Sequence, residues 1–325
     1  MKQKVYVTYQ IPEESLQKLK EKYEVFINRN ERTMTKEELK QELKDIDAVI
    51  AQYDNEFDKE VIDSLQNIKI IANYGVGYNN IDAEYAASKG IIVSNTPGVL
   101  TDATANLAFG LLFAVARRIA ESDRCVRAGK FEGWTPTCFL GQKITGKTLG
   151  IIGAGRIGSC LAKRTKGFDM KILYHDRNRN EEFEKETGAI YVSKEELLKE
   201  SDFMSLHVPL TKETKHMIGM DEFKMMKNSA ILINASRGPV VDEKSLVKAL
   251  KKGYIWGAGL DVYENEPEIE PELLELENVI LTAHIGSATV DTIEKMTNIS
   301  VENILAVLNG QVPPNGVNLD SIVNR

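Results

Sequence analysis

One segment, residues 149–158 with the sequence LGIIGAGRIG, constrains the fold of this chain more than any other. A short apolar run leads directly into a G-x-G-x-x-G pattern, and the amphipathic stretch after it suits a helix. The apolar run 170–174 suits a second strand, and Asp176 follows it, 18 residues after the last glycine of the pattern. Strand, glycine turn, helix, strand and acid is the order that a dinucleotide-binding βαβ unit needs.

Each glycine of this pattern has a physical reason to be a glycine. Gly153 permits the tight turn out of the strand, Gly155 lets the backbone approach a pyrophosphate, and Gly158 lets the helix pack close to the sheet. The pyrophosphate would lie at a helix N-terminus, where unpaired N–H groups and the helix dipole favour an anion. The alternative is a strand-to-helix turn without a ligand, but the complete order of elements favours binding.

Composition sets the outer limits on function. A chain of 325 residues is long enough for two domains, and 42% hydrophobic with 27% charged residues is ordinary for a soluble globular protein. The net charge of −7 argues against nucleic acid as the main partner, and no apolar run approaches the roughly 20 residues of a membrane span. Three widely spaced cysteines, Cys125, Cys138 and Cys160, suggest reduced thiols in the cytoplasm and neither disulfides nor a metal site.

Strand and helix patterns alternate along almost the whole chain, which predicts parallel sheets covered by helices. The expected strands besides those of the glycine motif are 5–9, 25–27, 48–52, 68–73, 91–94, 201–206, 230–234, 257–260 and 279–282. The expected helices include 12–20, 36–43 and one that begins near Asp82.

Two longer helical runs suggest how the domains are connected. Residues 101 to about 127 are predicted as a single apolar helix that crosses between domains, and 289 to about 308 as a helix that crosses back. The dinucleotide-binding domain, 101–287, would then be inserted into a substrate domain made of 1–100 and 288–325. The fold class predicted is therefore α/β, with two doubly wound parallel-sheet domains.

Charged side chains follow three of the later strands. Arg237 comes after 230–234, Asp261 after 257–260 and His284 after 279–282. Because ligands bind at the carboxyl edge of open parallel sheets, the three should converge near the cofactor if these strands share one sheet. The structural alternatives are a solvated turn for Arg237 and a hydrogen-bonded structural histidine for His284, while Glu266 could belong to a solvated acidic loop.

Several long motifs in the right order resemble the D-isomer-specific 2-hydroxyacid dehydrogenases, in detail their glyoxylate/hydroxypyruvate reductase branch. The motifs cover 74–82, 95–108, 233–242, 259–267 and 281–286, and the similarity extends over almost the whole chain. The resemblance implies a Rossmann NAD-binding domain inserted into a flavodoxin-like substrate domain, an active site in the cleft and a homodimer.

The resemblance also implies roles for individual residues. Arg237 would bind the carboxylate of a 2-oxoacid and polarise its carbonyl, His284 would act as the proton donor, and Glu266 as the acidic partner of that histidine. The backbone of Val76 and Gly77 would bind the substrate carboxylate, together with Arg237 and His284. The implied cofactor contacts are Thr104, Gly153, Gly155, Arg156, Ile157, Gly158, Asp176, Arg177, Val208, Pro209, Thr214, Ala235, Ser236, Asp261 and Gly286.

The choice of cofactor depends on the residues after 170–174. Asp176 would accept hydrogen bonds from the ribose hydroxyls of NAD and repel a 2′-phosphate. Arg177 and Arg179 follow at once, and some members of the branch use such arginines to hold the phosphate of NADP. The acid favours NAD(H), with NADP(H) as the alternative.

Glyoxylate or hydroxypyruvate is the expected substrate, and its reduction the expected reaction. D-3-phosphoglycerate and D-lactate dehydrogenases are the enzymatic alternatives. A different class of function is an NAD(H)-sensing scaffold similar to the corepressors that share this fold, because a fold alone does not decide function. Turnover would separate an enzyme from a sensor. No nucleic acid or membrane partner is expected.

Overall fold

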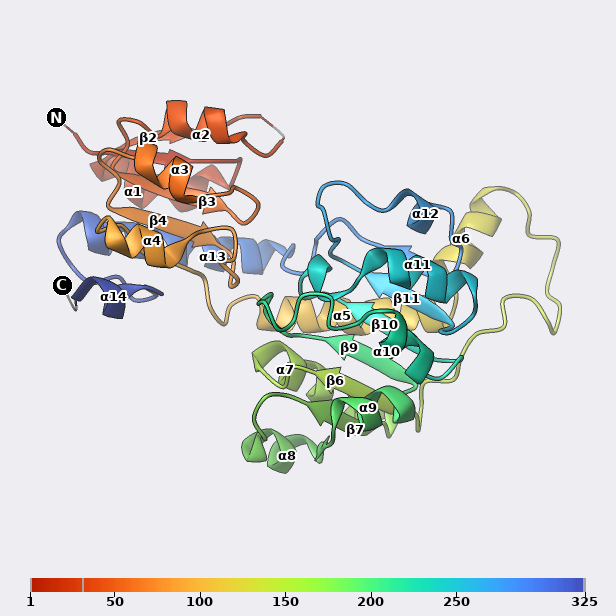
Figure 1. The fold of residues 1–325 in the computed structure, drawn as a ribbon. Coiled ribbons are helices and arrows are strands. Elements are labelled where there is room, and N and C mark those ends of the chain that lie inside the picture. Colours follow the sequence, from red (N-terminus) through yellow and green to blue (C-terminus); the bar gives the residue numbers. More distant parts are fainter. Residues whose placement is uncertain (1, 31, 324–325) are drawn as a thin grey trace. The chain divides into compact units, whose positions relative to one another are not determined.

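The computed structural model describes residues 2–30 and 32–323. The chain divides into two compact units, Met1–Leu100 with Ala288–Arg325 and Thr101–Ser287. Each unit is built on one parallel sheet with helices around it (Figure 1). The predicted fold class, two doubly wound parallel-sheet α/β domains, is confirmed.

The first unit contains five parallel strands in the order β2-β1-β3-β4-β5, which is the order of flavodoxin-like sheets. Its strands are β1 (Lys4–Val7), β2 (Glu24–Ile27), β3 (Ala48–Gln52), β4 (Ile70–Tyr74) and β5 (Ile92–Ser94). Its helices are η1 (Glu13–Leu16), α1 (Gln17–Lys22), α2 (Lys36–Glu42), α3 (Lys59–Ser64), α4 (Ala83–Ser88), α13 (Val290–Leu308) and α14 (Leu319–Val323). The helix α13 packs on β4, and the hydroxyl of Tyr74 donates to the carbonyl of Ile293 at 2.8 Å.

The second unit contains seven parallel strands in the order β12-β11-β10-β9-β6-β7-β8. Counted within the unit, this is the 3-2-1-4-5-6 order of the Rossmann fold with one further strand at the edge. The strands are β6 (Thr148–Ile152), β7 (Lys171–His175), β8 (Ile190–Tyr191), β9 (Phe203–Leu206), β10 (Ile231–Asn234), β11 (Gly257–Leu260) and β12 (Val279–Leu281).

Helices cover both faces of this second sheet, as Figure 1 shows. They are α5 (Thr101–Ala116), α6 (Ile119–Arg127), α7 (Arg156–Arg164), η2 (Thr165–Phe168), α8 (Glu181–Thr187), α9 (Lys194–Glu200), α10 (Met220–Met225), η3 (Gly238–Val240), α11 (Glu243–Lys251) and α12 (Pro271–Leu274). Alternate residues of a strand point to opposite faces, so Ile231 and Ile233 of β10 pack in one core with Leu111 of α5. Leu232 packs in the other core with Leu246 of α11.

The prediction of one helix from 101 to about 127 is wrong. The chain forms α5 and α6, which are bent by 64° at the break between them. Arg118 at the break has a φ of 53°, in the left-handed region, which ends α5. The carbonyl of Ala116 accepts a hydrogen bond from the N–H of Gln142 at 2.7 Å, so a later loop takes the place of the next helical turn. Arg118 also pairs with Glu121 and lies over the ring of Phe139.

Other differences from prediction are smaller. The short helix α3 and the two-residue strand β8 were not among the expected elements, whereas 289–308 forms α13 with Thr289 as its N-cap. Over the described residues, no single helix is long and apolar enough to cross a membrane, and only α5 and α6 taken together as a bent pair have the length and composition.

Candidate functional site

Polar segments follow four strands of the second unit at the carboxyl edge of its sheet. The glycine loop follows β6, Arg237 comes after β10, Asp261 follows β11 and His284 comes after β12. Each of these strands is parallel to its neighbours, so all four segments emerge at the same edge. The expectation that the strands before Arg237, Asp261 and His284 belong to one sheet is confirmed.

The three glycines of the loop occupy three different environments. Gly153 has a φ of 96°, and a Cβ there would lie 2.7 Å from the backbone carbonyl carbon of His207. A Cβ on Gly158 would lie 2.2 Å from the carbonyl oxygen of Gly153, so the helix α7 approaches the loop too closely for any side chain. Around Gly155, by contrast, no described atom lies within 4 Å of an added Cβ.

The N-terminus of α7 has the features of a phosphate site. Its N-cap is Gly155, which has no side chain to bond the first N–H groups of the helix, those of Arg156 and Ile157 among them. The helix dipole adds positive potential there. The open face of Gly155 and these donors fit the pyrophosphate of a dinucleotide.

Asp176 lies directly beside this loop. Its Oδ2 accepts the N–H of Ala154 at 2.9 Å, and its Oδ1 accepts the N–H of Arg177 at 2.7 Å. Each oxygen retains a second lone pair, so the carboxylate can still accept from a ribose hydroxyl. Arg177 is exposed, whereas the guanidinium of Arg179 is bonded to Glu184.

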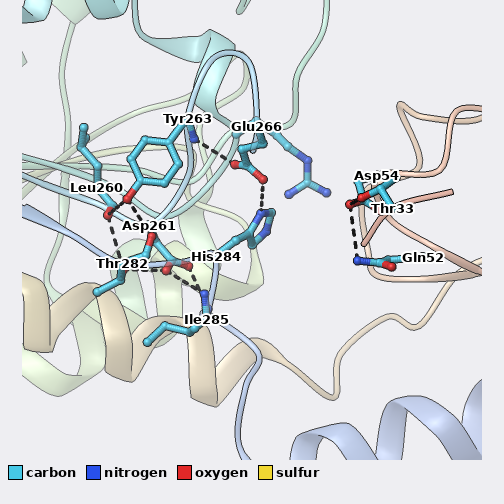
Figure 2. Close-up of polar contacts among 12 residues, drawn as sticks. Thr33, Gln52, Asp54, Leu260, Asp261, Tyr263, Glu266, Thr282, His284 and Ile285 are labelled. Carbon is cyan, nitrogen blue, oxygen red and sulfur yellow. Dashed lines mark hydrogen bonds and ion pairs between the residues drawn. The ribbon is translucent and has the colours of Figure 1, made fainter. Parts of the chain in front are cut away.

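His284 and Glu266 form a hydrogen-bonded pair, drawn in Figure 2. His284 Nδ1 lies 2.7 Å from Glu266 Oε2, and both side chains are about one-fifth exposed. Glu266 Oε1 accepts the N–H of Tyr263 at 2.9 Å. Burial alone would raise the pKa of Glu266, but the bond and charge of His284, the Tyr263 N–H and the charge of Arg237 outweigh it and hold that pKa below its usual value.

Asp261 holds the turn that carries the histidine. Its side chain is 1% exposed; Oδ1 accepts from the Thr282 hydroxyl and the N–H of Ile285, and Oδ2 from the N–H of Gly286, at 2.7 to 2.8 Å (Figure 2). His284 within that turn has a φ of 50°. The aspartate therefore positions the histidine, which is a role that the strand pattern alone did not indicate.

Arg237 is placed by contacts of its own backbone and by the loop next to it. The side-chain amide of Asn234 donates to the Arg237 carbonyl at 3.0 Å. A Cβ on the next residue, Gly238, would lie 1.7 Å from the carbonyl oxygen of Tyr263. The two loops that carry Arg237 and Glu266 thus pack backbone against backbone, which brings the arginine charge close enough to lower the pKa of Glu266.

Sequence patterns missed a second group of polar residues beneath these loops. Glu243, 5% exposed, accepts the N–H of Glu264, and His216 Nε2 lies 2.6 Å from Glu264 Oε1. Burial raises the pKa of Glu243. The sequence gives no signal for this group, because the burial of Glu243 at the first position of α11 depends on tertiary packing.

His207, at the end of β9, is the other residue of note. Its Nε2 lies 2.9 Å from the Ser205 hydroxyl, and burial lowers its pKa to about 4, so the ring is neutral at physiological pH. Its buried Nδ1 has no hydrogen-bond partner among the described residues. The ring therefore contributes no charge beside the glycine loop.

The remaining predicted cofactor residues have the following positions. The Thr104 hydroxyl, in the first turn of α5, donates to the Gly286 carbonyl at 3.3 Å. Thr214 donates to the Pro209 carbonyl at 2.7 Å. Val208 is half-buried, while Ala235 and Ser236 follow β10 directly.

Val76 and Gly77 belong to the first unit, after β4. Their carbonyls accept from the side-chain amides of Asn95 and Asn73, at 2.8 and 3.0 Å respectively. This arrangement holds the loop in a defined conformation. Nowhere in 2–30 and 32–323 do three or more His, Cys, Asp or Glu side chains gather as a metal site.

Comparisons of the sequence and of the structure with known proteins both point to one family. Residues 109–286 match the model of a family described as D-isomer specific 2-hydroxyacid dehydrogenase, NAD binding domain. The chain is 53% identical to a glyoxylate reductase of Thermococcus litoralis, over 100% of this chain and 99% of that protein.

Two solved structures extend the comparison. One is an NADPH-dependent glyoxylate/hydroxypyruvate reductase of Sinorhizobium meliloti in complex with NADP and malonate (32% identity, TM-score 0.85, 98% of this chain and 97% of that one). The other is a D-lactate dehydrogenase of Aquifex aeolicus complexed with NAD and lactic acid (30% identity, TM-score 0.83, 99% of this chain and 98% of that one).

Proposed function

The chain belongs to the D-isomer-specific 2-hydroxyacid dehydrogenase family, and from that premise we propose that it reduces glyoxylate or hydroxypyruvate to the corresponding 2-hydroxyacid. Membership makes it an NAD(P)-dependent oxidoreductase acting on CH–OH donors. The identity to a glyoxylate reductase over the full length supports this substrate class over the alternatives.

The hydrogen-bonded pair of His284 and Glu266 at the carboxyl edge of the Rossmann sheet is the observation that carries this proposal. With Nδ1 bonded to the carboxylate, Nε2 is the ring nitrogen that donates a proton to the substrate carbonyl oxygen. The carboxylate stabilises the imidazolium before transfer and fixes the orientation of the ring. A reduced nicotinamide, when bound, supplies the hydride.

Arg237 is proposed to bind the carboxylate of the 2-oxoacid. A planar guanidinium makes two parallel hydrogen bonds to a carboxylate, which fixes the orientation of the substrate. Its charge also favours the developing negative charge on the carbonyl oxygen. The backbone of Val76 and Gly77, in the first unit, stays a predicted contact of the substrate.

For the cofactor we favour NAD(H), with NADP(H) possible. The glycine loop, the uncapped N-terminus of α7 and the half-buried Asp176 fit the pyrophosphate and ribose of a dinucleotide. The remaining cofactor contacts, Asp261 among them, stay predictions.

A homodimer is proposed on the basis of exposed apolar side chains in α6 and the segment after it. They are Ile119, Val126, Phe131, Trp134 and Leu140, each more than half exposed. Contiguous exposed apolar patches mark interaction sites, and these side chains are proposed to form one. A second copy of this chain is the expected partner.

A cytoplasmic location also stays a prediction.

The test is reduction of a panel of oxoacids by the purified protein, followed by loss of reduced-cofactor absorbance. Glyoxylate, hydroxypyruvate, 3-phosphohydroxypyruvate and pyruvate would each be tried with NADH and with NADPH. The proposal predicts fast turnover of glyoxylate or hydroxypyruvate. Turnover of pyruvate or of the phosphorylated acid alone would assign the chain to another branch, and tight NADH binding with no turnover would favour the sensor.

A further inference from the structure

Glu184 holds Arg179, the second arginine that follows β7, and we infer that this contact makes Glu184 a determinant of cofactor specificity. By keeping the Arg179 guanidinium bonded, Glu184 would prevent it from binding the 2′-phosphate of NADPH. This inference rests on the proposed use of a nicotinamide dinucleotide and adds a residue to the selection made by Asp176.

The pair has the geometry of a fork. Arg179 Nε lies 2.8 Å from Glu184 Oε1, and Arg179 Nη2 lies 2.7 Å from Oε2. Two parallel bonds between guanidinium and carboxylate satisfy both groups at once. A phosphate that approached Arg179 would have to displace a carboxylate that already makes this arrangement.

A third contact makes the pair more than an ordinary surface ion pair. The hydroxyl of Tyr174, whose side chain is buried, donates to Glu184 Oε1 at 2.7 Å and accepts the N–H of Asn180 at 2.8 Å. Only 17% of the Glu184 side chain is exposed, against 61% of Arg179. The carboxylate is therefore held in place before the arginine binds it, so the carboxylate loses little further freedom when the pair forms.

The pair of Arg179 and Glu184 is relevant to the cofactor because the turn that carries Arg179 contacts the glycine loop. Asn180, the residue after Arg179, donates from its side chain to the carbonyl of Ala154 at 3.2 Å. The N–H of Ala154 is bonded to Asp176, the residue placed for the ribose. Arg179 is thus one residue from a direct contact with the dinucleotide loop, and in this inference its freed side chain would bind a 2′-phosphate held there.

Charge at the start of α8 acts in the same direction. Glu181, Glu182 and Glu184 lie in the first turn of this helix. A phosphate dianion would be repelled by Glu181, Glu182 and Asp176, while Arg179 is already neutralised by Glu184. Glu184 consequently cancels the charge of a cation beside the site.

The experiment is to measure dissociation constants of NADH and NADPH from nucleotide fluorescence for three variants. Glu184→Gln keeps the shape and the bond from Tyr174 to Oε1, but it removes the charge and sets an amide NH₂ donor against Arg179 Nη2, so the fork is broken and the arginine is released more easily. Glu181→Gln removes the same charge from the same helical turn without touching the fork, and Glu184→Gln with Arg179→Ala removes the freed arginine. We expect Glu184→Gln to tighten NADPH roughly three- to tenfold, within the range of an exposed charged contact, with NADH changed less than about twofold.

The double variant should lose this gain, and Glu181→Gln should show less than about half of it. Equal tightening by both single substitutions would mean that charge alone acts, and a gain that survives Arg179→Ala would exclude the arginine; either result overturns the inference. Loss of NADH affinity in Glu184→Gln would show that the residue only supports the loop. A wild-type protein that binds neither nucleotide would overturn the proposed function as well, whereas binding with an unchanged ratio overturns this inference alone.

Discussion

His284 has a backbone conformation that costs energy for any residue other than glycine. Its φ of 50° lies in the left-handed region, and such a residue persists where its surroundings determine it. Asp261 bonds the two N–H groups that follow it, and Glu266 bonds its ring. The histidine is therefore held at both backbone and side chain, which favours a fixed proton donor over a mobile one.

Replacement of Asp176 tests the choice of cofactor. Asp176→Ala should raise the ratio of kcat/KM with NADPH to that with NADH by roughly tenfold or more, because it removes both the ribose acceptor and a charge that repels a 2′-phosphate. Steady-state rates with each cofactor give the ratio. The control is Asp221→Ala, a change at an exposed acid of the same unit. An unchanged ratio in Asp176→Ala would show that Asp176 does not select the cofactor.

The lowered pKa of Glu266 gives a stability that depends on pH. Because this pKa is lower in the folded state than in the unfolded chain, the carboxylate contributes stability above its usual value of 4.5, and the contribution is lost as pH falls through the folded value. Glu266→Gln should lower the melting temperature by a few degrees at pH 7, roughly, and by less at pH 3. Thermal melts across this range measure the difference; a constant difference at every pH would contradict the assignment.

At the residue scale, sequence order indicates which residues gather at the site but not which bonds they make. Arg237, Asp261 and His284 follow strands that share one sheet, as their pattern predicts. The bonding of Arg179 to Glu184 is not visible in the same pattern, because it depends on how the turn before α8 is folded. The use of Asp261 to hold a turn likewise depends on tertiary contacts.

At the scale of the element, substitutions in the glycine loop separate an effect on NADH binding from an effect on folding. Gly155→Ala adds a Cβ where no described atom lies within 4 Å, so the melting temperature should stay within about 2 °C while NADH binding weakens at least tenfold, roughly. Gly158→Ala places a Cβ 2.2 Å from a carbonyl oxygen and should destabilise the fold by about 2 kcal/mol or more.

Calorimetry and NADH titration of both variants check this, with Gly110→Ala in α5, also in open space, as the control. If Gly155→Ala bound NADH as the wild type does, the pyrophosphate would not lie against that glycine. If Gly158→Ala left the melting temperature unchanged, the close packing of α7 on the loop would be wrong.

The break between α5 and α6 could not be predicted from the local sequence pattern. Apolar periodicity and helix propensity continue past Ala116, and neither glycine nor proline interrupts the chain there. The helix ends because the distant Gln142 bonds the carbonyl of Ala116. A distant hydrogen-bond donor of this kind cannot be identified from the sequence of the helix itself.

At the scale of the molecule, the exposed surface of α6 and the following segment predicts the oligomeric state. Trp134 is 82% exposed, and Trp134→Glu should convert a dimer to a monomer in light scattering at micromolar concentration, because the charge would be buried in the interface. Val312→Glu, at a site 73% exposed in the first unit, should leave the dimer intact. A wild-type monomer, or a Trp134→Glu dimer, would contradict the proposed interface.

Fold class could be predicted for the whole molecule because the strand and helix pattern is regular and the glycine motif is specific. Substrate identity could not, since a 2-oxoacid site needs only an arginine and a histidine pair that several reactions share. The similarity to glyoxylate reductases supplies the substrate class that these residues leave open.

The most direct test of the account is glyoxylate reduction by His284→Ala with NADH binding measured on the same protein. Loss of the proton donor should lower kcat by about 10²- to 10⁴-fold with NADH affinity retained, because the lost interaction acts mainly in the transition state. His216→Ala, which breaks the other histidine–glutamate pair of the unit, should stay within roughly threefold of the wild type. Near wild-type turnover in His284→Ala would contradict the assignment of the active site.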